Sequence, residues 1–146
     1  MKISYQEIKR WIANLAEQLK GFKPDVLVII AKWWLVGWYF LAKKLKVKKV
    51  VVLNFESYKW KTKGQIKSNN NCLNDWELCS YDKILIFDDL VDSWETMKAA
   101  IDYFIYAWPK IKTAVLFHKL TSTYMPDYIY KKVGNMWLNF VYEDPL

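Results

Sequence analysis

The chain has 146 residues, of which 53% are hydrophobic, and its formal net charge is +7. This length and apolar content predict one folded domain over residues 1–146 and exclude a disordered chain. The positive charge suits a polyanionic ligand such as a nucleotide or a diphosphate. Nucleic acid is less favoured, because a solvated helix face explains many of the lysines. Two cysteines with a single histidine do not make a zinc site, and they fit a reducing compartment.

No segment of the sequence predicts a membrane partner. The start Met-Lys-Ile-Ser lacks the apolar core of a signal peptide. The apolar run 26–42 is interrupted by Lys32 and is shorter than the roughly 20 residues that a spanning helix needs. We therefore expect a cytoplasmic protein.

The first elements are predicted by a capping box and by apolar periodicity. Ser4 and Glu7 form the capping box of a first helix, whose apolar face extends to Leu19. A buried strand is expected over 26–31, and a helix over 35–45.

The rest of the chain continues this alternation of strand and helix. A strand is expected over 47–55 and a polar loop over 56–74. A strand over 83–87 is followed by a helix that ends near 107 and by a strand over 113–118. A C-terminal part with a strand near 137–142 is expected to form a small hood. Alternating strands and helices predict an α/β fold with a mostly parallel central sheet and helices on both faces.

The acids that follow the third predicted strand are the most informative feature. Asp88, Asp89 and Asp92 come directly after an apolar run, and Ser93 and Thr96 open the next helix. In open α/β sheets, ligands bind at the carboxyl ends of the strands. A helix N-terminus beside hydroxyl groups is suited to holding a phosphate. This stretch therefore predicts a site for a sugar phosphate.

Three other interpretations of the acids remain. Residues 88–92 also spell DDxxD, the metal motif of isoprenoid synthases, but those enzymes carry it on helices and the preceding run here is typical of a strand. An aspartate site of the response-regulator or phosphatase type does not explain the hydroxyl-rich turn. A strand that ends in aspartates without function is the structural alternative.

The stretch resembles the phosphoribosyl-pyrophosphate signature of the type I phosphoribosyltransferases. That signature is an apolar strand, two acids, two variable positions, an acid and then Thr/Ser-Gly-x-Thr, and here Trp94 stands where the family has glycine. Over nearly the whole chain the order of elements is similar to that of the bacterial and archaeal xanthine-guanine (hypoxanthine) phosphoribosyltransferases. Three further segments carry the likeness, at Lys32-Trp33-Trp34, at Ser57-Tyr58, and at Lys119 with Trp137-Leu138.

The resemblance implies a purine phosphoribosyltransferase. Such an enzyme transfers 5-phosphoribosyl from phosphoribosyl pyrophosphate to guanine, xanthine or hypoxanthine, releases pyrophosphate, and uses Mg²⁺. It also implies a homodimer or a higher homo-oligomer. By the same resemblance, Asp88 and Asp89 would hold the ribose hydroxyls and Mg²⁺, and Asp92 would act as the general base at the purine N7.

The remaining roles follow from the same resemblance. Ser93, Trp94, Glu95 and Thr96 would cradle the 5-phosphate at the helix N-terminus. Lys32 and Trp33 would bind pyrophosphate, and Ser57 and Tyr58 would begin a flexible loop over the site. The residues expected at the purine are Lys119, Trp137 and Leu138.

Tryptophans at glycine positions leave two interpretations of the function open, and a third interpretation is that these tryptophans are not natural. Trp33, Trp34 and Trp94 replace glycines that let an anion cradle adopt φ > 0 and let ligand oxygens approach its amides. A bulky residue with φ > 0 is strained by about 1–3 kcal/mol. If the indoles point outward, the chain is a working enzyme. If they fill the phosphate sites, it is a catalytically impaired nucleotide-binding or regulatory protein of this fold.

Overall fold

The computed structural model describes residues 2–30, 35–53, 80–105, 109–135 and 139–140. In chain order the elements are β1 (Lys2–Ile3), α1 (Tyr5–Leu19), β2 (Val26–Ile30), α2 (Leu35–Leu45), β3 (Lys49–Leu53), β4 (Lys83–Val91), α4 (Trp94–Phe104), β5 (Lys110–Lys119), β6 (Tyr128–Val133) and β7 (Asn139–Phe140).

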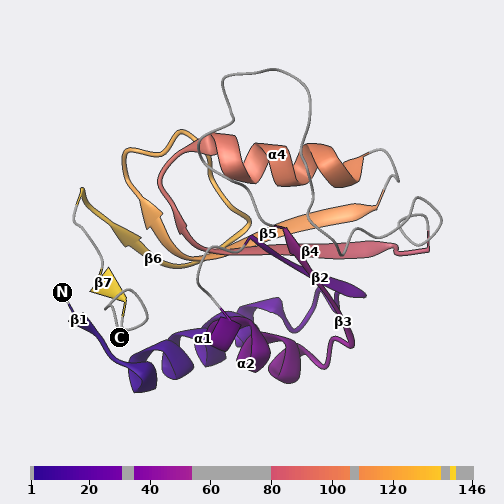
Figure 1. The fold of residues 1–146 in the computed structure, drawn as a ribbon, viewed down its shortest axis with the longest axis horizontal. Coiled ribbons are helices and arrows are strands. Elements are labelled where there is room, and N and C mark those ends of the chain that lie inside the picture. Colours follow the sequence, from indigo (N-terminus) through magenta and orange to yellow (C-terminus); the bar gives the residue numbers. More distant parts are fainter. Residues whose placement is uncertain (1, 31–34, 54–79, 106–108, 136–138, 141–146) are drawn as a thin grey trace.

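A five-stranded parallel sheet forms the centre of the fold. Its strand order is β3-β2-β4-β5-β6, and the short strands β1 and β7 form a separate parallel pair. Helices α1 and α2 cover one face of the sheet, and α4 covers the other (Figure 1). The predicted α/β fold with helices on both faces is therefore confirmed.

Helix α1 begins where the capping box predicts. The Ser4 backbone N–H donates to Glu7 Oε2 at 2.8 Å, and the Glu7 N–H donates to Ser4 Oγ at 3.3 Å. These two bonds satisfy amides that have no partner within the helix. The buried face of α1 is Ile8, Trp11, Ile12, Leu15, Ala16 and Leu19.

The core has two layers, one on each face of the sheet. Leu27 and Leu85 pack beneath α1 and α2, whereas Val26 and Ile84 pack beneath α4. All five residues of β2 are buried. A strand covered on both faces reads as a continuous apolar run, which is why the sequence predicts β2 well.

Strand β4 is longer than predicted. The sequence ends it at Phe87 and assigns the two acids to a loop, but the strand continues to Val91 and carries Asp88 and Asp89 itself. Asp88 pairs with Val115 of β5, whose ten residues extend the ladder past the apolar run. Partners on a neighbouring strand thus override the low strand propensity of aspartate.

Strand β6 was not predicted as a strand, since its residues were grouped with the C-terminal hood. It pairs with β5 from Ala114–Tyr128 to Lys119–Val133, and it completes the main sheet. Its Tyr130 ring packs on Trp11 of α1, with ring centroids 5.7 Å apart. The strand therefore forms because α1 and β5 provide its contacts.

Candidate active site at the carboxyl ends of β4 and β5

The predicted acids, hydroxyls and lysine come from three consecutive elements of the fold. Asp88 and Asp89 lie near the end of β4, Ser93 occupies the N-cap position of α4, and Lys119 is the last residue of β5. Because β4 and β5 are adjacent and parallel, their carboxyl ends lie at the same edge of the sheet. This is the edge at which open α/β sheets bind ligands.

The two adjacent carboxyl groups of Asp88 and Asp89 compete for ionisation. Asp88 is half-buried, and its Oδ1 accepts the Asp89 backbone N–H at 2.9 Å. Burial raises the pKa of the Asp88 carboxyl well above its ordinary value of 3.8, and the Asp89 charge and a side-chain hydrogen bond to Asp89 raise it further. Asp88 therefore keeps its proton to a higher pH than a solvated aspartate does.

The regular alternation of β4 is interrupted at these two acids. Phe87 and Leu90 both pack into the cluster beneath α1, although a regular strand turns residues three positions apart to opposite faces. The interruption therefore lies between them, at Asp88 and Asp89. The pairing register with β5 is the same on both sides of these acids, so the strand contains no inserted residue of the kind that makes a bulge.

Asp92 and Lys119 are brought together from 27 positions apart in the sequence. Lys119 Nζ donates to Asp92 Oδ2 at 2.7 Å. The lysine side chain is 8% exposed, whereas the aspartate side chain is 62% exposed. Lys119 is therefore not a solvated lysine at a strand end. The pair presents one side of its carboxylate to solvent.

The first turn of α4 contains the four residues predicted to cradle a phosphate. The Ser93 backbone is extended, and its hydroxyl makes no capping hydrogen bond, so this oxygen is not used by the helix itself. Trp94 and Glu95 begin the helix, and Thr96 is half-buried. The amides of a first helical turn lack partners within the helix, so they suit an anion.

Trp94 does not adopt the strained backbone that glycine would allow. Among the described residues other than glycine, only Lys23 and Lys46 have positive φ. Trp94 is helical, and its indole packs against the Tyr124 ring, with centroids 4.7 Å apart and planes inclined by 39°. The indole is 36% exposed. The Trp94 side chain thus packs against the loop between β5 and β6.

That loop is tied to β5 by Thr113 and Asp127. The Thr113 N–H and hydroxyl both donate to Asp127 Oδ2, at 2.8 and 3.1 Å, and the Asp127 N–H donates to Thr113 Oγ1 at 3.1 Å. Burial raises the pKa of Asp127, but its bonds to Lys112 and Thr113 outweigh burial and leave the pKa lowered. Asp127 therefore stays ionised and keeps the loop attached.

His118 belongs to the same attachment. The ring is buried, and Nε2 lies 2.6 Å from the Tyr124 carbonyl oxygen. Because a carbonyl oxygen only accepts, Nε2 carries the proton. Nδ1 is buried and has no hydrogen-bond partner.

Seven residues that the sequence predicts for the site or its loops lie outside the described residues. They are Lys32, Trp33, Trp34, Ser57, Tyr58, Trp137 and Leu138. Their roles stay predictions.

Asp88 and Asp89 fit the donor set that Mg²⁺ uses. No group of three or more metal-ligating side chains gathers within the described ranges. Mg²⁺ is commonly held by one or two carboxylates together with the phosphates of a substrate and water. Two adjacent carboxylates are compatible with that arrangement.

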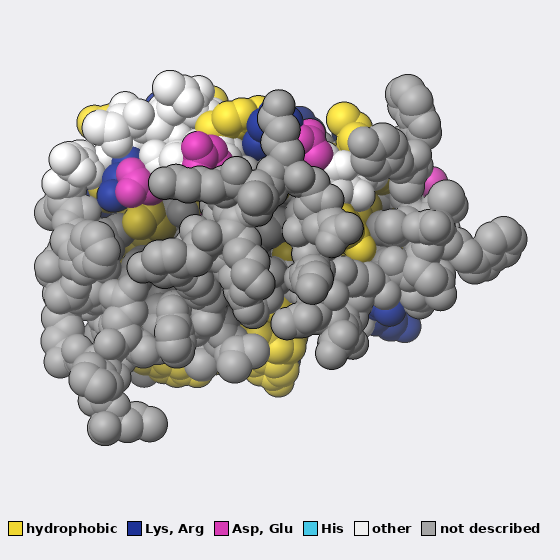
Figure 2. Space-filling view, turned by 45° about the horizontal axis from the view of Figure 1, so that its top comes forward, with side chains coloured by type: hydrophobic (Ala, Val, Ile, Leu, Met, Phe, Trp, Pro, Cys, Tyr) yellow, Lys and Arg dark blue, Asp and Glu magenta, His cyan; other side chains and the backbone are white. Residues whose placement is uncertain are grey.

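The described surface has no single basic patch on the α4 side. There, lysine side chains lie beside aspartate and glutamate side chains (Figure 2). Two of the ion pairs are Lys98–Asp102 and Lys112–Asp127. Within the described part of the chain, no helix is long and apolar enough to cross a bilayer.

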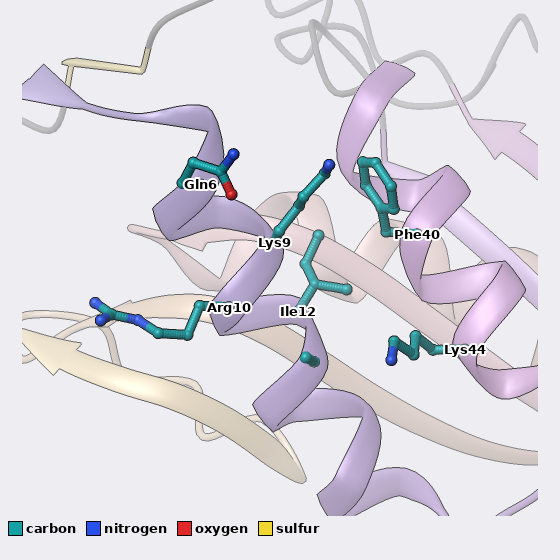
Figure 3. Close-up of a pocket in the computed structure, with 7 residues that line it drawn as sticks. Gln6, Lys9, Arg10, Ile12, Phe40 and Lys44 are labelled. Atoms are coloured by element: carbon teal, nitrogen blue, oxygen red, sulfur yellow. The ribbon is translucent and has the colours of Figure 1, made fainter.

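A hollow of about 400 Å³ lies between α1 and α2. Lys9 of α1 points towards Phe40 of α2, and its Nζ lies 4.9 Å from the centre of that ring (Figure 3). Because α1 and α2 cover the face opposite α4, this hollow is separate from the Asp92–Lys119 pair and from the first turn of α4.

The chain matches the family model described as "Phosphoribosyl transferase domain" over residues 1–143. It belongs to the phosphoribosyltransferase family. No curated protein matches it by sequence. Membership in this family confirms the family resemblance inferred from the sequence, and the roles of the individual residues stay predictions.

Solved structures that share the fold include two phosphoribosyltransferases. A purine phosphoribosyltransferase from Pyrococcus horikoshii is 24% identical with a TM-score of 0.79, and the match covers 100% of this chain and 95% of that one. The xanthine-guanine-hypoxanthine phosphoribosyltransferase of Helicobacter pylori is 20% identical with a TM-score of 0.77, covering 97% and 90%. A Neisseria gonorrhoeae protein with bound ppGpp is 21% identical with a TM-score of 0.77, covering 99% and 90%.

Sequence reasoning missed one residue that touches the predicted site. Tyr124 contacts Trp94, but it lies in a polar loop with no motif around it. The only signal was the tyrosine itself, five residues beyond Lys119. Its importance comes from the β5–β6 pairing, which the sequence did not predict.

Proposed function

We propose that this protein transfers 5-phosphoribosyl from phosphoribosyl pyrophosphate to a 6-oxopurine and releases pyrophosphate. The observation that carries the proposal is the hydrogen bond between Lys119 and Asp92, beside the free Ser93 hydroxyl at the start of α4. A cation for the purine, a carboxylate for its ring nitrogen and a phosphate cradle then occupy one edge of the sheet.

The sugar would lie at Asp88 and Asp89. In the reaction a purine nitrogen displaces pyrophosphate from C1 of the ribose, and positive charge develops on the sugar. The Asp89 carboxyl accepts hydrogen bonds from the ribose hydroxyls, and its negative field favours the developing charge. Asp88 also accepts hydrogen bonds from the ribose hydroxyls, and burial raises the pKa of its carboxyl.

The 5-phosphate would lie at the first turn of α4. The Ser93 and Thr96 hydroxyls and the unpaired amides of that turn donate to its oxygens, and the helix dipole adds attraction. Trp94 and Glu95 contribute backbone amides only. Neither residue needs to bring its side chain to the ligand.

The purine would lie at Asp92 and Lys119. The Lys119 ammonium donates to the oxygen on purine C6, and Asp92 receives the proton from N7. Their ion pair leaves the other side of the exposed carboxylate open to the base. It also fixes the distance between the two groups before the base arrives.

Asp88 and Asp89 would hold Mg²⁺ together with the substrate's diphosphate. When bound, the ion neutralises the charge of the leaving pyrophosphate. The two carboxylates of β4 orient the ribose in either case.

The experiment is an assay with phosphoribosyl pyrophosphate, Mg²⁺ and each of guanine, xanthine and hypoxanthine. Nucleoside monophosphate formation is followed by absorbance, and pyrophosphate by a coupled reaction. We expect turnover with at least one base and a loss of about 100-fold or more in kcat for Asp92→Asn, as for a lost general base. Asp102→Asn, an exposed carboxylate on the far part of α4, is the matched control and should keep full activity. No turnover with any base at high enzyme concentration would refute the proposal.

A second candidate is a nucleotide-binding or regulatory protein of this fold with impaired catalysis. A specific feature favours it: the Trp94 indole replaces the family glycine at the start of α4. The similar Neisseria protein, which holds ppGpp, makes a guanine nucleotide a reasonable ligand to try. Tight binding of GMP or ppGpp with no turnover would select this candidate over the enzyme.

A further inference from the structure

Tyr124 makes hydrogen bonds through its hydroxyl, its carbonyl and its N–H. Its hydroxyl oxygen lies 2.9 Å from Thr113 Oγ1, its carbonyl oxygen lies 2.6 Å from His118 Nε2, and its N–H donates to Ser122 Oγ at 3.3 Å. The Thr113 hydroxyl gives its only proton to Asp127, so the Tyr124 hydroxyl is the donor in the bond between them. Burial raises the pKa of Tyr124, so this donor stays protonated through neutral pH.

The Trp94 indole packs against the Tyr124 ring. The two centroids are 4.7 Å apart, within the range of favourable aromatic pairs. The indole is attached at the first residue of α4, directly beside Ser93, whose hydroxyl the helix does not use. An indole that left Tyr124 could rotate over the unpaired amides of that turn. One that stays on Tyr124 lies towards the β5–β6 loop.

We propose that Tyr124 is a positioning residue that holds the Trp94 indole beside the phosphate cradle and so keeps the cradle open. This inference rests on the proposed function, because it takes the first turn of α4 as the 5-phosphate site. Tyr124 does not touch the phosphate. It sets the fraction of molecules whose cradle is free, and the apparent Kd of a phosphate ligand varies inversely with that fraction.

The test compares Tyr124→Ala in two backgrounds, with Trp94 present and with Trp94→Gly. GMP affinity is measured by calorimetry. With Trp94 present, we expect Tyr124→Ala to raise Kd about tenfold, which is equivalent to about 1.4 kcal/mol. In the Trp94→Gly background the same substitution should change Kd by less than about twofold, because no indole is left to enter the cradle.

A second ligand and two further variants separate this role from a structural one. Guanosine lacks the 5-phosphate, so its affinity should not change with Tyr124→Ala. Tyr124→Phe keeps the ring and should lose about threefold at most. Tyr39→Ala removes an exposed tyrosine of α2 on the opposite face and should have no effect. In the free protein, the indole N–H signal of Trp94, assigned by Trp94→Phe, should shift in Tyr124→Ala and not in Tyr39→Ala.

Several results would overturn the inference. An equal loss of GMP affinity in both backgrounds means that Tyr124 acts through the loop and not through the indole. Equal losses for GMP and guanosine mean general loosening of the site. An unshifted Trp94 signal means that the rings are not in contact. If wild type binds no GMP but Trp94→Gly does, the indole already blocks the cradle. If neither binds, the proposed function itself fails.

Discussion

Breaking the bond between Asp92 and Lys119 should destabilise the protein more than breaking an exposed ion pair. Asp92→Asn removes the negative charge and keeps the size of the side chain. It leaves the Lys119 ammonium, only 8% exposed, without its carboxylate and with little water to replace it. Asp92→Asn should therefore lower the free energy of unfolding.

The magnitude follows from the exposure of the two partners. Removing one partner of a fully buried pair costs about 3–5 kcal/mol, whereas exposed pairs contribute about 0.2–1 kcal/mol. Lys119 resembles the first case and Asp92, at 62% exposed, the second. We expect a loss of about 1–2 kcal/mol, or a fall in Tm of about 3–6 °C for a chain of this length.

The assay is urea and thermal unfolding of Asp92→Asn beside Asp102→Asn. The control breaks the Lys98–Asp102 pair, whose side chains are 48% and 52% exposed, and should lose about 0.3 kcal/mol. In 1 M salt the control's effect should vanish, whereas that of Asp92→Asn should persist, because a buried ammonium is poorly screened. Equal losses for both variants would show that Lys119 does not depend on Asp92, and the reasoning about the site's ion pair would be wrong.

Three further predictions address the acids and the helix starts. Asp88→Asn should stabilise the protein at neutral pH. The folded state raises the pKa of Asp88, so the wild type loses stability as pH rises from 3.8 to the folded pKa. The gain of the variant over wild type should therefore shrink as pH falls towards 3.8, and thermal melts at several pH values measure it. Ser93→Ala should change unfolding by less than about 0.5 kcal/mol, since its hydroxyl caps nothing, yet should weaken GMP binding; a large stability loss contradicts this. Ser4→Ala should lose about 1 kcal/mol in urea unfolding by removing the capping box with Glu7, and a neutral result would deny that the box holds α1.

Local patterns were enough where a segment's own residues decide its structure. The capping box and apolar face of α1, and the buried run of β2, follow from neighbouring residues alone. Helix α2 has the bounds that the sequence predicts, Leu35–Leu45. The parallel sheet follows from the alternation of such segments.

Other features depend on partners distant in the sequence. Strand β4 continues through Asp88 because β5 pairs with it, and Tyr128–Val133 becomes a strand because β5 and α1 lie beside it. The strand propensities of these residues predict neither the longer β4 nor the strand β6, so the sequence alone misses both.

The residues by themselves determined the family, the order of the elements and the types of side chain at the candidate site, because a short signature and periodic apolar positions encode them locally. Only the tertiary structure decided that Lys119 reaches Asp92 and that the Trp94 indole rests on Tyr124. Both contacts join segments whose distance in space depends on the β4–β5 register and on the loop that His118 and Thr113 hold in place.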